Sequence, residues 1–401
     1  MCGICGVFTN ELTERHEKII KNILQDQHPR GPDHQEMIAI HHQKGGALLG
    51  HNRLSIIDLS SHSNQPMWDL SGRYCISYNG EIYNYLELRQ ILQNHGLTFQ
   101  SSGDTEVILN AFIYWGIDAL SYLQGPFAFA LYDKQMNELW LCRDRFGVRP
   151  LYYVIEKEQL FFASMTHTLA QTLQLKPDLL YVSRGLNYLV YEDDSNGSPY
   201  EKMFSVQAGH YLHAKFGNTD HIQINTNQYY NLSQQVEKRI HHLPMTNTKQ
   251  ILEDIYHSLE KSVQLRLRTD VTSGITLSSG LDSSTIASLV RQQHKDVIGF
   301  SYGHPDNTKS EGALVANCAN YLGIHIEYIS PTVDEIIEGL FKTIEIQDAP
   351  FSSLSIVAQY LLYKQINASG IKVILGGQGG DEVFMGYRKY MLFQLQNLLR
   401  Q

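Results

Sequence analysis

Short apolar runs separated by turn residues fill the first half of the chain and predict many β-strands. Strand-like stretches lie at 47–51, 73–78, 127–132 and 139–143, the last two apolar enough to be buried. The stretch 73–78 ends at Asn79-Gly80, a strong turn signal. Apolar residues at helical spacing predict helices over 81–95 and 104–115. This half is therefore predicted to form stacked sheets with helices outside.

From Thr248 onward, helical and strand-like segments alternate. Helices are predicted at 251–266, 283–294 and 311–322, and strands at 274–277, 297–302, 325–329 and 372–375. Such alternation is typical of a parallel sheet with crossover helices. Glycine-rich turns follow two of these strands, at the sheet edge where open α/β sheets bind ligands. Between the halves, residues 192–247 are polar and predict a connector with short strands near 209–214.

Composition narrows the class of protein. The 401 residues suffice for two or three domains. A net charge of −9 without a basic run argues against nucleic-acid or membrane-surface partners. Neither a signal-peptide pattern nor an apolar run of about 18 residues is present in the sequence. With five scattered cysteines, these features predict a cytoplasmic protein whose thiols are reduced.

Cys2 directly follows Met1. Removal of Met1 would give Cys2 a free α-amine beside its thiol, and the amine could act as the base for that thiol. Cys2 and Cys5 also form a Cys-x-x-Cys pair, which can be a redox or zinc motif. A second such pair, needed for a four-cysteine zinc site, does not occur in the sequence.

Two loops of small residues follow predicted strands in the second half. Ser278-Ser279-Gly280-Leu281-Asp282-Ser283 runs into a helix, whose N–H groups would attract an anion. The loop lacks the lysine of the Gly-x-x-x-x-Gly-Lys motif and resembles the loop of enzymes that cleave ATP to AMP and pyrophosphate. A simple helix cap is the alternative. The second loop, 376–382, carries four glycines and Asp381, a candidate Mg²⁺ ligand like Asp282.

Further motifs extend the pattern to nearly the whole chain: Cys2-Gly3-Ile4, 28–33, 53–58, 78–84, 102–106 and 143–153. In their order and residue identity, these motifs resemble those of glutamine-dependent asparagine synthetases. The resemblance implies an α/β and α+β fold: a four-layer α/β/β/α N-terminal-nucleophile (Ntn) hydrolase sandwich at 2–190, the glutaminase domain. A connector at 191–247 and a parallel-sheet α/β ATP-pyrophosphatase domain at 248–401, without its usual C-terminal part, would follow.

The resemblance also implies the roles of the glutaminase residues. Cys2 would attack the side-chain amide of glutamine, and Asn79 with Gly80 would form the oxyanion hole. Glutamine would be bound by Arg53, Ile57, Asn79, Gly80, Glu81 and Asp104. Each has an alternative interpretation: a surface ion pair for Arg53, a helix cap for Asp104, a hairpin turn for Asn79-Gly80.

In the second half, the resemblance implies ATP binding by Leu277, Ser278, Ser279, Gly280, Asp282, Ser283, Tyr302, Gly376 and Gly377. Asp282 and Asp381 would hold Mg²⁺. The substrates would be glutamine, ATP and a carboxylate acceptor, by default aspartate. The partner would be a second copy of the chain, as a homodimer, or a polypeptide that supplies the missing C-terminal segment.

Two departures from the family pattern leave alternatives open. Gln378 stands where many asparagine synthetases carry a carboxylate, which favours another acceptor, such as a sugar or natural-product acid. The chain ends at Gln401, before the segment in which the family carries a lysine that stabilises the adenylate. The second alternative is therefore a glutaminase or regulatory relic with an incomplete synthetase half.

Overall fold

The computed structural model describes residues 1–188, 196–217, 221–240, 247–304, 306 and 311–400. Its contacts divide the chain into two units. The first unit comprises Met1–Met245 together with Ile346–Ser352, and the second comprises Thr246–Glu345 with Ser353–Gln401. The predicted boundary at 190/191 lies outside the described residues.

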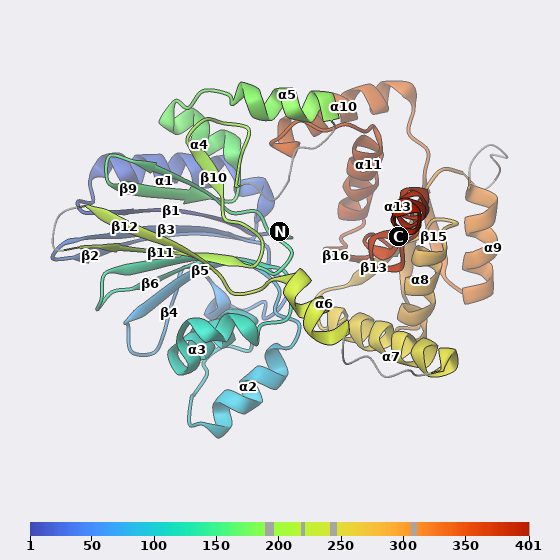
Figure 1. The fold of residues 1–401 in the computed structure, drawn as a ribbon, viewed down its shortest axis with the longest axis horizontal. Helices are drawn as coiled ribbons and strands as arrows, with labels where there is room; N and C mark the ends of the chain where they lie inside the picture. The colour runs from blue at the N-terminus through green and yellow to red at the C-terminus, as the bar shows by residue number, and fades with distance from the viewer. Residues whose placement is uncertain (189–195, 218–220, 241–246, 305, 307–310, 401) are drawn as a thin grey trace. The chain divides into compact units, whose positions relative to one another are not determined.

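Two six-stranded antiparallel sheets form the framework of the first unit (Figure 1). One sheet has the order β10-β8-β9-β1-β3-β2, with β1 Gly3–Thr9, β2 His34–His42, β3 Gly45–Arg53, β8 Tyr152–Glu156, β9 Gln159–Ala163 and β10 Met203–Ser205. The other has the order β12-β11-β7-β6-β5-β4, with β4 Met67–Trp68, β5 Tyr74–Gly80, β6 Phe127–Asp133, β7 Glu138–Arg143, β11 His210–Phe216 and β12 Ile222–Gln228.

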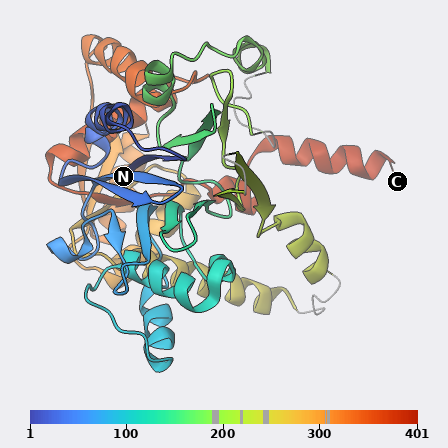
Figure 2. The ribbon, with the colours of Figure 1, turned by 90° about the vertical axis from the view of Figure 1, so that its left-hand side faces the viewer.

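Helices cover the outer faces of this sandwich. α1 (Glu14–Asp26) and α4 (Thr166–Leu173) pack on the first sheet, and α2 (Tyr85–Asn94) and α3 (Asp104–Trp115) belong to the second. Figure 2 shows α1 and α3 on opposite sides of the strands. The unit also contains α5 (Leu179–Tyr188) and α6 (Leu232–Ile240). The predicted four-layer α/β/β/α sandwich is confirmed.

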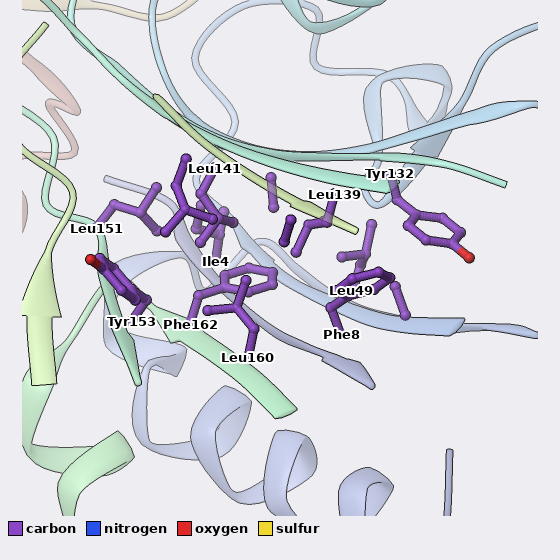
Figure 3. Close-up of a cluster of buried hydrophobic side chains, with 14 of the residues drawn as sticks. Ile4, Phe8, Leu49, Tyr132, Leu139, Leu141, Leu151, Tyr153, Leu160 and Phe162 are labelled. Carbon is purple, nitrogen blue, oxygen red and sulfur yellow. The ribbon is translucent and has the colours of Figure 1, made fainter. Parts of the chain in front are cut away.

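Strand β1 is apolar on both faces because it has a core on each side. Ile4 and Phe8 point between the two sheets, where they meet Leu49 and Phe162 (Figure 3). Cys5 and Val7 point the other way, under α1. Cys5 is thus a core residue, and burial raises the pKa of its thiol. Among the described residues, no group of three metal-ligating side chains occurs.

Two segments differ in detail from the sequence-based expectation. Asn79 and Gly80 do not form a turn: they end β5 and pair with Ala128 and Phe127 of β6. The predicted connector contains three strands. β10 belongs to the first sheet, and β11 and β12 belong to the second. Its polar appearance comes mainly from β12, an edge strand on which most residues are exposed.

The second unit is built on a four-stranded parallel sheet, as predicted. Its order is β15-β14-β13-β16, with β13 Ser273–Thr276, β14 Ile298–Tyr302, β15 His325–Ile329 and β16 Val373–Leu375. Its helices are α7 Thr248–Arg266, α8 Leu281–Gln293, α9 Gly312–Leu322, α10 Val333–Gln347, α11 Ser355–Ala368, α12 Gly380–Phe384 and α13 Arg388–Arg400. The chain runs outward from β13 to β15 and returns to β16 on the other side. A topological switch point therefore lies between β13 and β16. None of the helices within the described ranges combines the length and hydrophobicity that crossing a bilayer requires.

Candidate active site

The Cys2 thiol lies where the first strand of the chain meets the end of β3. Gly3 pairs with Asn52, which brings Cys2 beside the residues that follow β3. The N–H of Leu54 donates to Cys2 Sγ at 3.4 Å, and the cysteine is half-buried. The thiol is therefore next in space to Arg53, the last residue of β3.

Two arginines also approach the N-terminus, Arg30 from the 3-10 helix His28–Arg30 and Arg149 from the loop after β7. Arg30 Nε donates to the Cys2 carbonyl oxygen at 3.0 Å, and Arg149 contacts the sulfur of Met1. Arg30 Nη2 and Arg149 Nε are buried and find no hydrogen-bond partner in the part of the chain that the structure describes. Sequence reasoning did not select either residue, although both belong to motifs that it used.

The pKa shifts at the N-terminus favour a neutral amine beside a protonated thiol. Burial, with the nearby charges of Arg30 and Arg149, lowers the pKa of the Met1 α-amine to about 6. Burial raises the pKa of the Cys2 thiol, while the neighbouring ammonium opposes the shift. Burial at this end of the chain thus favours the neutral form of the Met1 α-amine, which can accept a proton.

Arg53 presents a buried positive charge whose partners are all neutral. Its Nη1 donates to the Ser60 carbonyl oxygen and to Asn64 Oδ1, both at 2.8 Å, and its Nη2 donates to the Asp58 carbonyl oxygen. None of the ion pairs among the described residues involves Arg53, so the structure does not show the predicted alternative of a surface ion pair. A buried guanidinium without a carboxylate partner is suited to bind one from a ligand.

The Asp58 side chain holds the loop that carries these carbonyl groups. It accepts hydrogen bonds from Ser60 N at 3.0 Å, Ser60 Oγ at 2.6 Å and Ser102 N at 2.7 Å. Burial alone would raise the pKa of Asp58, but these hydrogen bonds outweigh it and lower the pKa below the ordinary value. Asp58 thereby joins the Arg53 loop to the segment before Asp104. Sequence reasoning did not identify it.

Asp104 supplies a buried negative charge at the start of α3. The cap residue of this helix is Gly103, and the Asp104 side chain instead accepts hydrogen bonds from Tyr78 OH at 2.8 Å and Ile82 N at 2.9 Å. Burial raises the pKa of Asp104, although both hydrogen bonds oppose the shift. In the described ranges no cation pairs with it, so an ammonium group of a ligand would compensate its charge. Tyr78 is a further residue that sequence reasoning missed.

Asn79 offers a hydrogen-bond donor that the protein leaves unused. Its side chain is buried, and Nδ2 has no partner among the described residues. Its neighbour Tyr78 accepts a hydrogen bond at its carbonyl oxygen from His51 Nε2 at 2.9 Å, and His51 pairs with Ile4. Asn79 and Gly80 therefore lie on β5 opposite the start of β1. Of the other predicted residues, Glu81 directly follows Gly80 and Ile57 lies in the loop after β3, and both are half-buried.

In the second unit, the two glycine-rich loops touch each other at the switch point. The hydroxyl of Ser283 accepts from Ser278 N at 3.1 Å, which curls the first loop over the start of α8. A Cβ at Gly377 would lie 2.6 Å from Ser283 N, and one at Gly380 would collide with the Asp282 carboxylate. The loops can lie this close only because glycines stand at both positions.

The other predicted ATP-binding residues lie near this edge. Leu277 follows β13 and is buried, and Tyr302 ends the neighbouring β14 and is 40% exposed. Ser279 N donates to Glu311 Oε2 at 3.2 Å, so an acidic oxygen already approaches the loop amides. Asp282 lies in the first turn of α8, and Asp381 lies in the first turn of α12.

A cysteine at the start of a two-sheet sandwich, flanked by a buried cation, a buried anion and an unpaired amide, defines the class of Ntn amidotransferases. A glutamine amidotransferase domain model matches residues 1–230, and an asparagine synthase model matches residues 254–400. The chain belongs to the family of glutamine-hydrolysing asparagine synthetases.

Relatives in this family are substantially longer. Asparagine synthetase [glutamine-hydrolyzing] 1 of Bacillus subtilis is 31% identical over 397 residues, which are 97% of this chain and 59% of that protein. Amidase chry2 of Gibberella zeae is 28% identical over 415 residues, 96% of this chain and 59% of that protein. The chain thus spans less than two thirds of the length of these relatives. Among solved structures, glutamine phosphoribosylpyrophosphate amidotransferase from Bacillus subtilis, complexed with ADP and GMP, is similar with a TM-score of 0.42 and 18% identity, over 88% of this chain and 71% of that chain.

Proposed function

We propose that the first unit hydrolyses glutamine to glutamate and ammonia at Cys2. After removal of Met1, the α-amine of Cys2 in its unprotonated form takes the thiol proton, and the thiolate attacks the side-chain amide carbon. Asn79 Nδ2 and the Gly80 N–H stabilise the oxyanion. Ammonia leaves with the proton from the amine, and water then hydrolyses the thioester to release glutamate and the free thiol.

The observation that carries this proposal is the pair of uncompensated buried charges near Cys2. Arg53 matches the α-carboxylate of glutamine, and Asp104 matches its α-ammonium. Ile57 and Glu81 are the remaining residues of the proposed glutamine site. The five cysteines are all free, which supports a reducing compartment such as the cytoplasm for this chemistry.

We further propose that the second unit uses ATP to activate a carboxylate for amidation by the ammonia, with release of AMP and pyrophosphate. Aspartate is the default acceptor. The nucleotide would lie along the two loops, held by Leu277, Ser278, Ser279, Gly280, Asp282, Ser283, Tyr302, Gly376 and Gly377. Asp282 and Asp381 would hold Mg²⁺, which neutralises charge on the phosphates.

A second candidate acceptor is a different carboxylic acid. Gln378 is an exposed amide in the 376–382 loop and cannot pair with an ammonium group as a carboxylate would. The name of the Gibberella zeae relative, an amidase, supports this alternative. Exchange of labelled pyrophosphate into ATP separates the candidates, because only the true acceptor supports exchange. If no acid supports exchange while glutaminase activity persists, the relic alternative replaces both.

Asp58→Asn should weaken glutamine binding with little effect on the chemical step. Asparagine tolerates the left-handed backbone of this position, where φ is 53°, but loses the charge that Ser60 and Ser102 stabilise. We expect KM for glutamine to rise about 10-fold, as for loss of charge-assisted hydrogen bonds, and kcat to stay within about threefold. Glutamate release measures both constants. Asp69→Asn, which removes a comparable turn carboxylate elsewhere, is the control. An unchanged KM would show that Asp58 does not orient Arg53.

A further inference from the structure

The segment between α10 and α11 belongs structurally to the glutaminase unit. α10 ends at Gln347 and α11 begins at Ser355, yet residues 346–352 group with the first unit rather than with these helices. Asp348, which directly follows α10, is the anchor of this segment. Its side chain is only 14% exposed.

Asp348 caps helix α4 from a distance of 182 positions in the sequence. Its carboxylate accepts hydrogen bonds from the N–H of Thr166 and, at 2.7 Å, from the N–H of His167. The same carboxylate contacts His167 Nδ1 at 2.7 Å, and Thr166 Oγ1 donates to the Asp348 carbonyl oxygen at 3.0 Å. The residue before α4, Met165, provides no side-chain cap, so Asp348 supplies the acceptors that this helix end needs.

The backbone of Asp348 is itself in an unfavourable conformation. Its φ is 65°, in the left-handed region that residues with a side chain seldom adopt. Such conformations persist where surrounding contacts impose them, and they concentrate at functional sites. Asp348 makes its contacts to Thr166 and His167 from this conformation.

Two short routes connect Asp348 with the nucleophile. On the first, α4 follows Ser164, whose Oγ accepts from Ile4 N at 3.0 Å and whose N–H donates to the Ile4 carbonyl oxygen at 2.9 Å. On the second, the Asp348 charge acts on the Arg30 guanidinium, and Arg30 Nε donates to the Cys2 carbonyl oxygen. Both routes end on the backbone of residues 2–4.

We propose that Asp348 is a positioning residue for the Cys2 nucleophile, acting through the N-terminus of α4 and through Arg30. The inference rests on the proposed glutaminase function. A residue from the second half of the sequence thereby contributes to the reactivity of Cys2.

The test compares Asp348→Ala and Asp348→Asn with Glu338→Gln, an exposed carboxylate of α10, as control. In Asp348→Ala we expect kcat for glutamate release to fall about 10- to 100-fold, as for a misplaced reactive group, with KM within about threefold. Alkylation of Cys2 by iodoacetamide, followed on its own peptide by mass spectrometry, should become at least about threefold faster because the N-terminus opens more often. Hydrogen exchange at the Thr166 and His167 amides should also accelerate.

Asp348→Asn should lie between wild type and Asp348→Ala, because one amide oxygen still accepts a hydrogen bond. It also serves as the test if the alanine variant does not fold. Faster exchange at Thr166 and His167, with kcat and Cys2 alkylation both unchanged, would reduce Asp348 to a helix cap and overturn the inference. If the wild-type chain releases no glutamate, the proposed function fails, but the alkylation rates still decide whether Asp348 positions Cys2.

Discussion

Cys2→Ala should abolish the release of glutamate from glutamine, with kcat reduced by at least about 10³-fold. The thiol is the only group in the proposed mechanism that forms a bond to substrate, and the oxyanion donors Asn79 and Gly80 have no intermediate to stabilise without it. The variant should fold, because Cys2 is half-buried and precedes β1 rather than lying in the core. Glutamate release by the purified chain measures kcat, and thermal unfolding checks that the variant folds.

Cys318→Ala is the matched control for this substitution. Cys318 is the other cysteine that is not fully buried, and it lies on α9 of the second unit. It should leave glutamate release unchanged. Cys2→Ala should also leave any ammonia-dependent, ATP-consuming reaction intact, because that chemistry belongs to the second unit. Glutamate release that persists in Cys2→Ala would refute the assignment of the nucleophile.

Much of the fold was predictable because the spacing of apolar residues reflects directly which positions are buried. The helix at 104–115 and the strand at 325–329 have the predicted bounds. The helix predicted from 81 begins only at Tyr85, because Glu81 N and Tyr83 N donate to Pro126 O and Gln124 O and prolong the pairing beyond β5. The edge strand β12 resembled a connector because most of its residues face solvent. In both places, tertiary pairing decides what local pattern leaves open.

Some residues of the candidate site were likewise predictable from the sequence, and others were not. Residues that would touch substrate, such as Arg53 and Asp104, stand in recognisable motifs and were predicted. Those that orient them were not, because their role depends on contacts between distant segments: Asp58 reaches Ser102, and Asp348 reaches Thr166. No local pattern marks an aspartate as the cap of a helix 182 positions away. Such positioning residues become visible only in three dimensions.

Asn79→Ala should lower kcat for glutamate release about 10²- to 10³-fold, the effect of removing one donor from an oxyanion hole. The buried Nδ2 has no partner within the described residues, so its hydrogen bond is available to a group that appears during the reaction. Since an oxyanion exists only in the transition state and intermediate, KM should change by less than about threefold. The Gly80 N–H remains, which accounts for the residual rate. Steady-state kinetics of glutamate release separate the two constants.

Ser77→Ala is the matched control because Ser77 is buried on the same strand, two residues before Asn79. Its hydroxyl donates to the Gly50 carbonyl oxygen at 2.9 Å, so its loss should cost about 1 kcal/mol of stability. Its kcat should stay at the wild-type value, which distinguishes a lost catalytic donor from a weakened strand. Asn79→Asp should be slower than Asn79→Ala, because an ionised carboxylate would repel the developing oxyanion. If both Asn79 variants kept kcat within about threefold of wild type, the oxyanion would have to be stabilised by other donors and the orphaned amide would serve no catalytic purpose.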